Sequence, residues 1–386
     1  MIKKCKHCKS ILKKVLDLPS IPLANSFEKS VKKKYKLSLS ICEKCKLFQQ
    51  THIPSKRNIF NADYPYLTSK SQKNKIFFRK LKKKISLKKN QFIIDIGCND
   101  GTFLKNFDNK KYKHLGIDPS RIATNLAKER GLKIYNNFFD LDFAKKILRK
   151  HGQADVIFSS NTLAHVENIN QILKGISLLL KQNGTLYVQN IYLYDLIEKV
   201  YFDQIYHEHI FTYSIESLNN IFQKYGLYLS SVEFNDIQGG SFLAKFTKIR
   251  KKNKKILNII ENEQKKSLLF KKNQIQYKNL INKKLKIFKN LINKKLKNNL
   301  IISGYGASAK CVMMINLLKL NVSHIKFIVD NTPKKQNKYI PGTNIPIISP
   351  KKFINEKSDI CIIFTWNYAK EIMDKTKQKV NWIILK

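Results

Sequence analysis

The sequence predicts an α/β protein, with a Rossmann-like domain flanked by a small cysteine-anchored module at the N-terminus and a second α/β domain at the C-terminus. Short apolar runs alternate with helical segments from about residue 90 to 250, which is typical of a doubly wound parallel sheet. The alternation resumes at residue 300. Four of the seven cysteines form two Cys-x-x-Cys pairs within the first 45 residues. These observations predict four parts, at residues 1–70, 71–250, 251–299 and 300–386.

The first part, residues 1–70, has the cysteine spacing of a zinc site. Its pairs are Cys5-Lys-His-Cys8 and Cys42-Glu-Lys-Cys45. Pairs of this kind bind zinc tetrahedrally, and the alternative, disulfides, is rare in cytosolic chains. Because four thiolates complete the coordination, we expect a structural zinc ion that supplies folding energy to a module with little core. The isolated cysteines, Cys98, Cys311 and Cys361, are expected to be core residues.

The second part, residues 71–250, carries the strands of the main sheet. We predict buried strands at QFIIDIG, HLGID, ADVIFSS and GTLYVQN. YLSSVEF and SFLAKFTKI, joined by NDIQGG, are predicted to pair as an antiparallel hairpin. A parallel sheet that ends in a hairpin is typical of class I methyltransferases.

Residues 251–299 are predicted to form a lysine-rich helical spacer. NLINKKLK occurs at 279–286 and again at 290–297, a spacing close to three helical turns. Leu280, Leu285, Leu291 and Leu296 are expected to form an apolar stripe on a neighbouring domain, and a nucleic-acid-binding arm is the alternative. After residue 300, LIISGYGASAKCVMMINLL predicts strand, glycine turn and helix. The backbone N–H groups of Gly304-Tyr-Gly306-Ala-Ser-Ala-Lys310 could bind an anion at the helix N-terminus, or the glycine turn could simply let the strand enter the helix.

The net charge of +47 suggests a nucleic-acid or anionic-membrane partner at first sight. Only six of the 74 basic residues are arginine, however, and arginine is the side chain that bidentate phosphate and base recognition favours. Abundant lysine, asparagine and isoleucine instead indicate a compositional bias displayed on solvated faces. No apolar run reaches the roughly 18 residues of a membrane helix, and the N-terminus lacks an apolar signal core. We therefore expect a cytoplasmic monomer without a nucleic-acid partner.

The segment after the first strand of the middle domain predicts a cofactor site. Its glycines permit a tight turn and close approach of a ligand. It matches neither the dinucleotide fingerprint nor the lysine-bearing phosphate loop. The next strand ends in an aspartate about twenty residues later, where a carboxylate can accept hydrogen bonds from ribose hydroxyls. This acidic pattern favours the amine-bearing S-adenosylmethionine (SAM), and the alternative is an ordinary strand-to-helix joint. The expected cofactor-binding residues are Asp95, Gly97, Asn99, Asp100, Gly101 and Asp118.

Two further segments carry histidines where a substrate is expected. Asn161-Thr-Leu-Ala-His165 follows the fourth strand, at the edge of the sheet where ligands bind, and a helix would put its two ends on one face. Residues 205–214, IYHEHIFTYS, place His207, Glu208 and His209 after a tyrosine. An extended segment would put the two histidines on one side, whereas a helical turn would fan the side chains out. Metal chelation by these histidines ranks below proton transfer, because the cysteines already complete a zinc site.

In chain order, the Cys-x-x-Cys pairs, DIGCNDG, NTLAH, FDQIYHEHIFTYS and PGTNIPI resemble the three-part nucleotide-sugar C-methyltransferases over essentially the whole chain. The resemblance implies a SAM-dependent enzyme that methylates a ring carbon of a nucleotide-linked 4-keto deoxysugar, for a surface glycan or a glycosylated metabolite. The segment NNFFDLDFA resembles the family only loosely, so no adenine contact is assigned there. The implied active-site residues are Tyr66, Asn161, His165, Tyr206, Glu208 and His209.

The residue types suit carbon methylation, because a ring carbon becomes nucleophilic only after loss of a proton alpha to the keto group. A histidine is suited to take that proton, and the resemblance favours His209. Glu208 would orient the site or hold the substrate, while Tyr206 and His165 would donate hydrogen bonds to the developing enolate oxygen. Three alternatives remain: a sugar O-methyltransferase, a zinc-ribbon RNA methyltransferase or RNA-binding protein, and a regulatory binding protein without catalysis.

Overall fold

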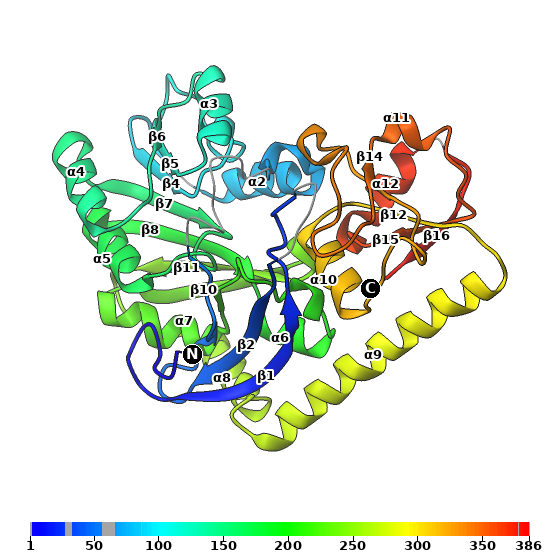
Figure 1. The fold of residues 1–386 in the computed structure, drawn as a ribbon. Helices are drawn as coiled ribbons and strands as arrows, with labels where there is room; N and C mark the ends of the chain where they lie inside the picture. The colour runs from blue at the N-terminus through cyan, green and yellow to red at the C-terminus, as the bar shows by residue number, and fades with distance from the viewer. Residues whose placement is uncertain (1, 28–32, 56–65, 86, 377, 386) are drawn as a thin grey trace.

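The computed structural model describes residues 2–27, 33–55, 66–85, 87–376 and 378–385, which form three β-sheets with helices around them (Figure 1). Residues 63–65, in the segment before Tyr66, lie outside the described residues. The two larger sheets are those that the strand patterns predict. The third belongs to the cysteine-containing module.

The N-terminal sheet has four strands in the order β1-β2-β3-β9. Its strands β1 (Leu12–Ile21), β2 (Tyr35–Cys42) and β3 (Phe48–Gln50) pair antiparallel. The last strand, β9 (Phe211–Thr212), comes from the middle of the chain and pairs with β3. We refer to the described residues 2–55 as the zinc module. Its sheet is therefore completed by a strand from the predicted segment 205–214, which begins two residues after His209.

The central sheet has seven strands in the order β10-β11-β8-β7-β4-β5-β6. Neighbouring strands from β4 to β8 are parallel, and β11 pairs antiparallel with both β8 and β10. The predicted strands and the closing hairpin are thus confirmed, although β8 begins before the predicted segment. The bounds are β4 (Phe92–Ile96), β5 (Lys113–Asp118), β6 (Ile134–Asn136), β7 (Ala154–Ser160), β8 (Leu180–Ile191), β10 (Tyr228–Asn235) and β11 (Ser241–Thr247).

Helices pack around this sheet, and several begin at side-chain caps. Ser120, Asp140 and Asn168 each accept a hydrogen bond from a backbone N–H in the first turn of the helix that follows. The five residues of β4 are all buried, as expected of a central parallel strand. The helices are α2 (Gln72–Lys84), α3 (Arg121–Glu129), α4 (Leu141–His151), α5 (Ile169–Leu179), α6 (Leu193–Glu198) and α7 (Ile215–Phe222).

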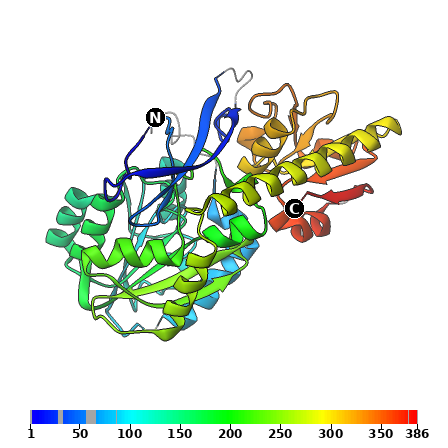
Figure 2. The same ribbon diagram turned by 90° about the horizontal axis from the view of Figure 1, so that it is seen from below.

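The predicted helical spacer consists of α8 (Lys254–Lys265) and the long α9 (Lys271–Lys297), which runs along one side of the C-terminal domain in both views (Figures 1 and 2). The predicted stripe needs correction at one position, because Leu280 is exposed. Tyr277, Ile281 and Ile292 are buried instead, while Leu285, Leu291 and Leu296 are partly buried against the same core. With 3.6 residues per helical turn, the face of α9 that packs on the core includes Ile281, the residue after Leu280.

The C-terminal sheet has five parallel strands in the order β14-β13-β12-β15-β16. The predicted strand, glycine turn and helix are β12 and α10, and Ser308 caps the helix. The three isolated cysteines are buried, as predicted. The elements are β12 (Ile302–Tyr305), α10 (Ala309–Leu317), β13 (Ile328–Val329), β14 (Ile347–Ile348), α11 (Pro350–Phe353), β15 (Ile360–Ile363), α12 (Ala369–Lys375) and β16 (Asn381–Ile384).

Candidate active site

The glycine turn after β4 packs tightly against the loop that follows β7. Gly97 and Gly101 both have positive φ, at 77° and 72°, a conformation that glycine adopts without cost. A Cβ atom on Gly97 would lie 1.8 Å from Oγ1 of Thr162. The Thr162 hydroxyl in turn donates to the carbonyl oxygen of Ile96 at 3.1 Å. The turn therefore brings its own backbone to the edge of the sheet and next to residues 161–165.

Asp118 lies at the end of β5, beside this turn. Its carboxylate accepts hydrogen bonds from the backbone N–H of Asn99 at 2.9 Å and of Ser120 at 2.8 Å. Burial raises the pKa of Asp118 to about 6, although these two bonds act in the opposite direction. Burial and the nearby Asp118 also raise the pKa of Asp95. Each oxygen of Asp118 keeps a further lone pair, so the carboxylate can still accept from a ribose hydroxyl.

Asn99 and Asp100 hold the segment that carries Tyr66. Thr68 N–H donates to Oδ1 of Asn99 at 2.8 Å, and Ser69 N–H donates to Oδ2 of Asp100 at 3.1 Å. The Asn99 amide also donates to the carbonyl oxygen of Tyr66 at 3.1 Å. These bonds explain why polar residues follow Gly97, and they hold the Tyr66 backbone beside residues 97–101, the predicted cofactor turn.

Residues 161–165 form a turn rather than the helix that the Asn161–His165 spacing suggested. Asn161 has φ of 52°, and its side-chain amide donates to Oε1 of Gln189 at 2.9 Å. His165 Nδ1 lies 2.6 Å from the carbonyl oxygen of Glu208. A carbonyl oxygen only accepts, so Nδ1 carries the proton. Gln189, fully buried on β8, was not among the predicted residues, and only its position at the end of a strand points to it.

Residues 206–209 form a tight turn, closed by a 2.9 Å hydrogen bond from His209 N–H to the carbonyl oxygen of Tyr206. The Tyr206 hydroxyl lies 2.8 Å from Nε2 of His209. His209 Nδ1 lies 2.8 Å from the carbonyl oxygen of Gln204 and therefore carries the proton. Nε2 is thus the basic nitrogen of a neutral ring, and it accepts from Tyr206.

Several groups keep His209 neutral. Burial lowers its pKa well below the usual value, and His165 and Lys310 act in the same direction, whereas the bond to Gln204 raises it. The His165 ring lies 5.0 Å from that of His209, measured between centroids. Burial lowers the pKa of His165 to about 4. Both rings are therefore neutral near neutral pH, with one proton each, on Nδ1.

Glu208 and His207 point away from this pair, toward the zinc module. The Asn25 amide donates to Oε1 of Glu208 at 2.9 Å. Burial raises the pKa of Glu208 to about 7. His207 is fully buried, with Nε2 3.2 Å from the carbonyl oxygen of Tyr35 and its ring at the edge of the Tyr35 ring. Because residues 206–209 form a turn, their side chains point in different directions. His207 therefore packs against Tyr35 and lies away from His209.

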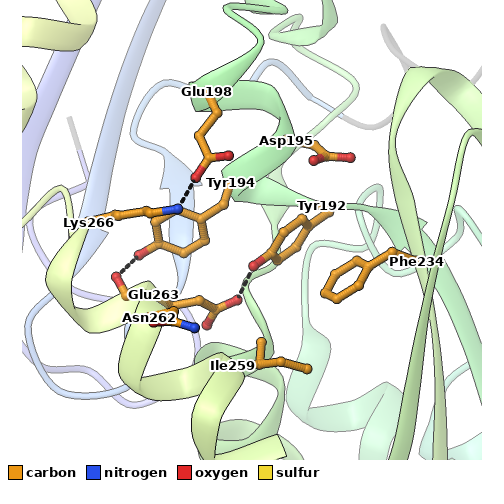
Figure 3. A pocket seen from close by; sticks show the side chains of 9 residues that line it. All are labelled: Tyr192, Tyr194, Asp195, Glu198, Phe234, Ile259, Asn262, Glu263 and Lys266. Atoms are coloured by element: carbon orange, nitrogen blue, oxygen red, sulfur yellow. Dashed lines mark hydrogen bonds and ion pairs between the residues drawn. The ribbon is translucent and has the colours of Figure 1, made fainter. Parts of the chain in front are cut away.

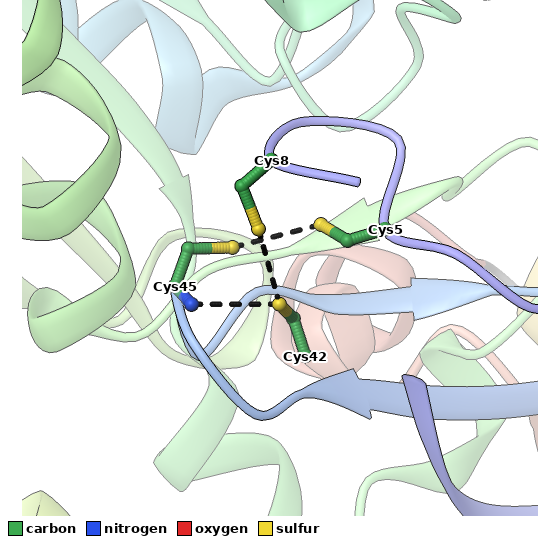
Figure 4. A group of neighbouring side chains, drawn as sticks. All are labelled: Cys5, Cys8, Cys42 and Cys45. Atoms are coloured by element: carbon green, nitrogen blue, oxygen red, sulfur yellow. Dashed lines mark hydrogen bonds between the residues drawn. The ribbon is translucent and has the colours of Figure 1, made fainter. Parts of the chain in front are cut away.

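The four N-terminal cysteines converge on one point (Figure 4). Their sulfur atoms all lie within 4.8 Å of one another, with Cys5–Cys45 at 3.6 Å and Cys8–Cys42 at 3.4 Å. Tetrahedral zinc with bonds of ~2.3 Å separates its sulfur ligands by roughly 3.8 Å. The four sulfurs fit such an ion, and no side chain of residues 206–209 is needed to complete it.

Lys310 lies between the domains. It is buried, donates to Oδ1 of Asn367 at 2.9 Å and lies 4.6 Å from the centroid of the Trp366 ring. The indole N–H of Trp366 donates to Asp203 at 2.8 Å. Burial lowers the pKa of Lys310 to about 8, partly opposed by Asp203. The contacts are those of a residue packed at a domain interface.

A pocket of about 250 Å³ lies elsewhere, between α6 and α8 (Figure 3). None of the predicted site residues lines it. Its buried carboxylate, Glu263, accepts from the Tyr192 hydroxyl and from the first two backbone N–H groups of α7. Glu263 therefore caps that helix, and the pocket has a structural explanation.

The central sheet, with parallel strands, a closing hairpin and a glycine turn beside Asp118, defines a class I SAM-dependent methyltransferase. Three family models match the chain in succession. They are a zinc binding domain over residues 5–60, a methyltransferase domain over 71–232 and a C-methyltransferase C-terminal domain over 236–384. Together the three models extend from residue 5 to residue 384, so the chain has a zinc binding domain, a methyltransferase domain and a C-methyltransferase C-terminal domain in that order.

A curated relative and several solved structures are similar to this chain. The C-methyltransferase NovU of Streptomyces niveus is 28% identical over 351 residues, covering 89% of this chain and 83% of its own. A SAM-dependent methyltransferase from Aquifex aeolicus has a TM-score of 0.33 and 18% identity, over 45% of this chain and 89% of its own. The PH0226 protein from Pyrococcus horikoshii has a TM-score of 0.38 and 15% identity, over 50% and 97%. Among the described residues, no helix is both long and apolar enough to cross a membrane.

Proposed function

We propose that this chain methylates a ring carbon of a nucleotide-linked keto-deoxysugar in the cytoplasm, with His209 as the base. Carbon as the acceptor agrees with the family models and with NovU. The sugar substrate is supported by the motifs quoted above, from DIGCNDG to YHEH. The observation that carries the proposal is the Tyr206–His209 pair, because it offers an unprotonated imidazole nitrogen bonded to a hydroxyl.

The pair lies beside the cofactor turn through a short chain of contacts. Thr162 contacts Gly97, and His165, three residues later, lies against the His209 ring. SAM, when bound, supplies an electrophilic methyl group. The residues that would hold SAM are those of the glycine turn and Asp118. This turn requires glycine at position 97, because a Cβ there has no room beside Thr162.

In the proposed mechanism Nε2 of His209 accepts the proton from the ring carbon alpha to the keto group. The Tyr206 hydroxyl then loses its acceptor on Nε2 and donates instead to the enolate oxygen, where negative charge develops. His165 has a different role from the predicted one. Its proton is on Nδ1 and is donated to Glu208, so a neutral His165 has no proton on Nε2 to give to an enolate. It instead keeps a neutral ring beside His209 when His209 becomes positively charged.

Of the two roles predicted for Glu208, orienting the site and holding the substrate, we propose the first. Its carboxylate contacts Asn25 of the zinc module, and its carbonyl oxygen receives the bond from His165. Through these two contacts Glu208 fixes the turn that presents His209. This leaves Tyr206 and His209 as the residues of the turn that meet the sugar.

The test uses labelled SAM and a panel of nucleotide-linked keto-sugars, with the methyl position located by NMR. We expect a new carbon–carbon bond and loss of deuterium placed on the accepting carbon. His209→Asn should abolish transfer and leave SAM binding, measured by calorimetry, unchanged. Retention of the deuterium with a methyl on oxygen would show sugar O-methylation, and wild-type turnover by His209→Asn would remove His209 as the base.

A further inference from the structure

We propose that Gln50 of the zinc module is a positioning residue, which fixes the Tyr206–His209 turn by bonding both of its ends. The inference rests on the proposed function, since it assigns Gln50 a role only through His209. It gives the zinc module a part in the methyl-transfer step beyond its own folding.

Gln50 lies at the end of β3 and is fully buried. Its Nε2 is 2.6 Å from the carbonyl oxygen of Tyr206 and 2.7 Å from that of His209. Both partners only accept, so the amide nitrogen, with its two hydrogens, must face them. One side chain thus joins the first and last residues of the turn.

The backbone repeats this connection. Gln50 N–H donates to the carbonyl oxygen of Ile210 at 2.9 Å. The two preceding strand positions pair with β9, Phe48 opposite Thr212 and Gln49 opposite Phe211. The predicted zinc ligand Cys45 lies three residues before the start of this strand. The zinc knuckle, β3 and the turn therefore form one continuous hydrogen-bonded unit.

Other residues of the module contact the interior of the turn. Tyr35 accepts from His207, and Asn25 donates to Glu208. The module thus reaches all four residues 206–209, two through their carbonyls and two through their side chains. The methyltransferase domain adds the bonds from His165 to Glu208 and from His209 to Gln204.

The placement of His209 affects the rate of proton removal more than the affinity for SAM. A base must lie within hydrogen-bond reach of the proton that it removes, and a displacement of ~1 Å can cost about 100-fold in rate. SAM binds at the glycine turn of another sheet, which Gln50 does not touch. Loss of the Gln50 amide should therefore lower kcat and leave SAM affinity intact.

Gln50→Met tests this, since methionine has similar length and no amide donors. The matched control is Gln49→Met on the same strand. Gln49 is also fully buried, but its side chain accepts from Lys6 N–H beside the zinc knuckle. We expect kcat to fall about 10- to 100-fold in Gln50→Met, with unchanged SAM affinity and zinc content. Gln49→Met should stay within about threefold of wild-type kcat at a similar cost in stability.

The kinetic isotope effect separates positioning from a smaller folded fraction. With deuterium on the accepting carbon, the isotope effect on kcat should rise in Gln50→Met, because proton removal becomes slower relative to other steps. An unchanged isotope effect, or equal kcat losses in the two variants, would overturn the inference. If Gln50→Met does not fold, Gln50→Asn retains an amide too short to span both carbonyls and should show a smaller loss with the same rise.

The result also separates this inference from the proposed function. If His209→Asn is inactive but a folded Gln50 variant has wild-type kcat, His209 remains the base and Gln50 has no positioning role. An active His209→Asn overturns both, because no base then remains for Gln50 to position.

Discussion

The Tyr206 hydroxyl donates a 2.8 Å hydrogen bond to Nε2 of His209, and the two ring centroids lie 4.0 Å apart. The two residues stand at the ends of one four-residue turn, which a backbone hydrogen bond from His209 N–H to the carbonyl oxygen of Tyr206 closes. Their placement relative to the cofactor turn depends instead on the zinc module and on residues 161–165. Pair formation and pair placement can therefore be tested separately.

Removing the Tyr206 hydroxyl should slow methyl transfer without weakening cofactor binding. Tyr206→Phe leaves Nε2 of His209 available but takes away the donor to the enolate oxygen, a loss of about 100- to 1,000-fold in kcat. Steady-state kinetics with a keto-sugar, together with calorimetric titration of SAM, measure both quantities. Tyr213→Phe is the matched control, because that buried hydroxyl donates to the carbonyl of Leu163. Equal kcat in the two variants would contradict the assignment.

Gly97→Ala should weaken SAM binding more than its backbone strain alone would predict. Its Cβ would enter the Thr162 side chain at 1.8 Å and push the turn away from residues 161–165. Gly131 has nearly the same φ, 76° against 77°, with nothing within 4 Å of an added Cβ. Both alanines should cost about 1–2 kcal/mol in free energy of unfolding from the positive φ. Only Gly97→Ala should lower SAM affinity, by at least about 10-fold; similar affinities would argue against a cofactor role for the turn.

Much of the fold could be predicted because its signals are local. Each predicted strand of the central sheet is a short apolar run, and the hairpin is marked by NDIQGG. The pairing of β9 with β3 could not be predicted, since Phe211 and Thr212 are two residues that join a sheet begun more than 150 positions earlier. Leu280 was misplaced because the repeat NLINKKLK offers two adjacent apolar positions, and the helix buries Ile281.

In the candidate site, too, features set by residues close in the sequence could be predicted, and features set by distant residues could not. The cysteine spacing and the glycine turn were readable, because each is set by residues close in the sequence. The direction of Glu208 was not, because Asn25, its partner, is 183 residues away. The proton position on His165 depends on a carbonyl 43 residues away. Gln50 and Gln189 were missed because a glutamine in an apolar strand has no motif; only its burial shows its importance.

Glu208→Gln should change how stability depends on pH. Burial raises the pKa of Glu208 from 4.5 to about 7, so between these values the folded protein keeps a proton that the unfolded chain has released. The free energy of unfolding therefore falls by about 1.4 kcal/mol per pH unit across this window from this group, and the fall ends above pH 7. Glutamine carries no such proton, so the variant should gain up to about 3 kcal/mol relative to wild type between pH 4.5 and 7.5. Denaturant unfolding from pH 5 to 7.5 measures this.

The matched control is Glu233→Gln, on β10, where the carboxylate is 54% exposed and pairs with Lys84. It should leave the wild-type pH dependence in place. Curves for Glu208→Gln that run parallel to wild type over this range would mean that Glu208 is not held protonated by burial.

Removal of zinc should abolish methyl transfer while SAM binding survives. The ion would join two knuckles of a module whose last strand holds the Tyr206–His209 turn, whereas the cofactor turn lies in a separate seven-stranded sheet. Cys42→Ala should lower the bound zinc, measured by mass spectrometry, reduce kcat by at least about 100-fold and change the SAM dissociation constant by less than about threefold. Cys361→Ala, at an equally buried cysteine of the C-terminal sheet, should retain both zinc and turnover. Full turnover by a zinc-free Cys42→Ala protein would show that the turn holds its geometry without the module, and loss of SAM affinity in parallel with zinc would show that the two sheets are not independent.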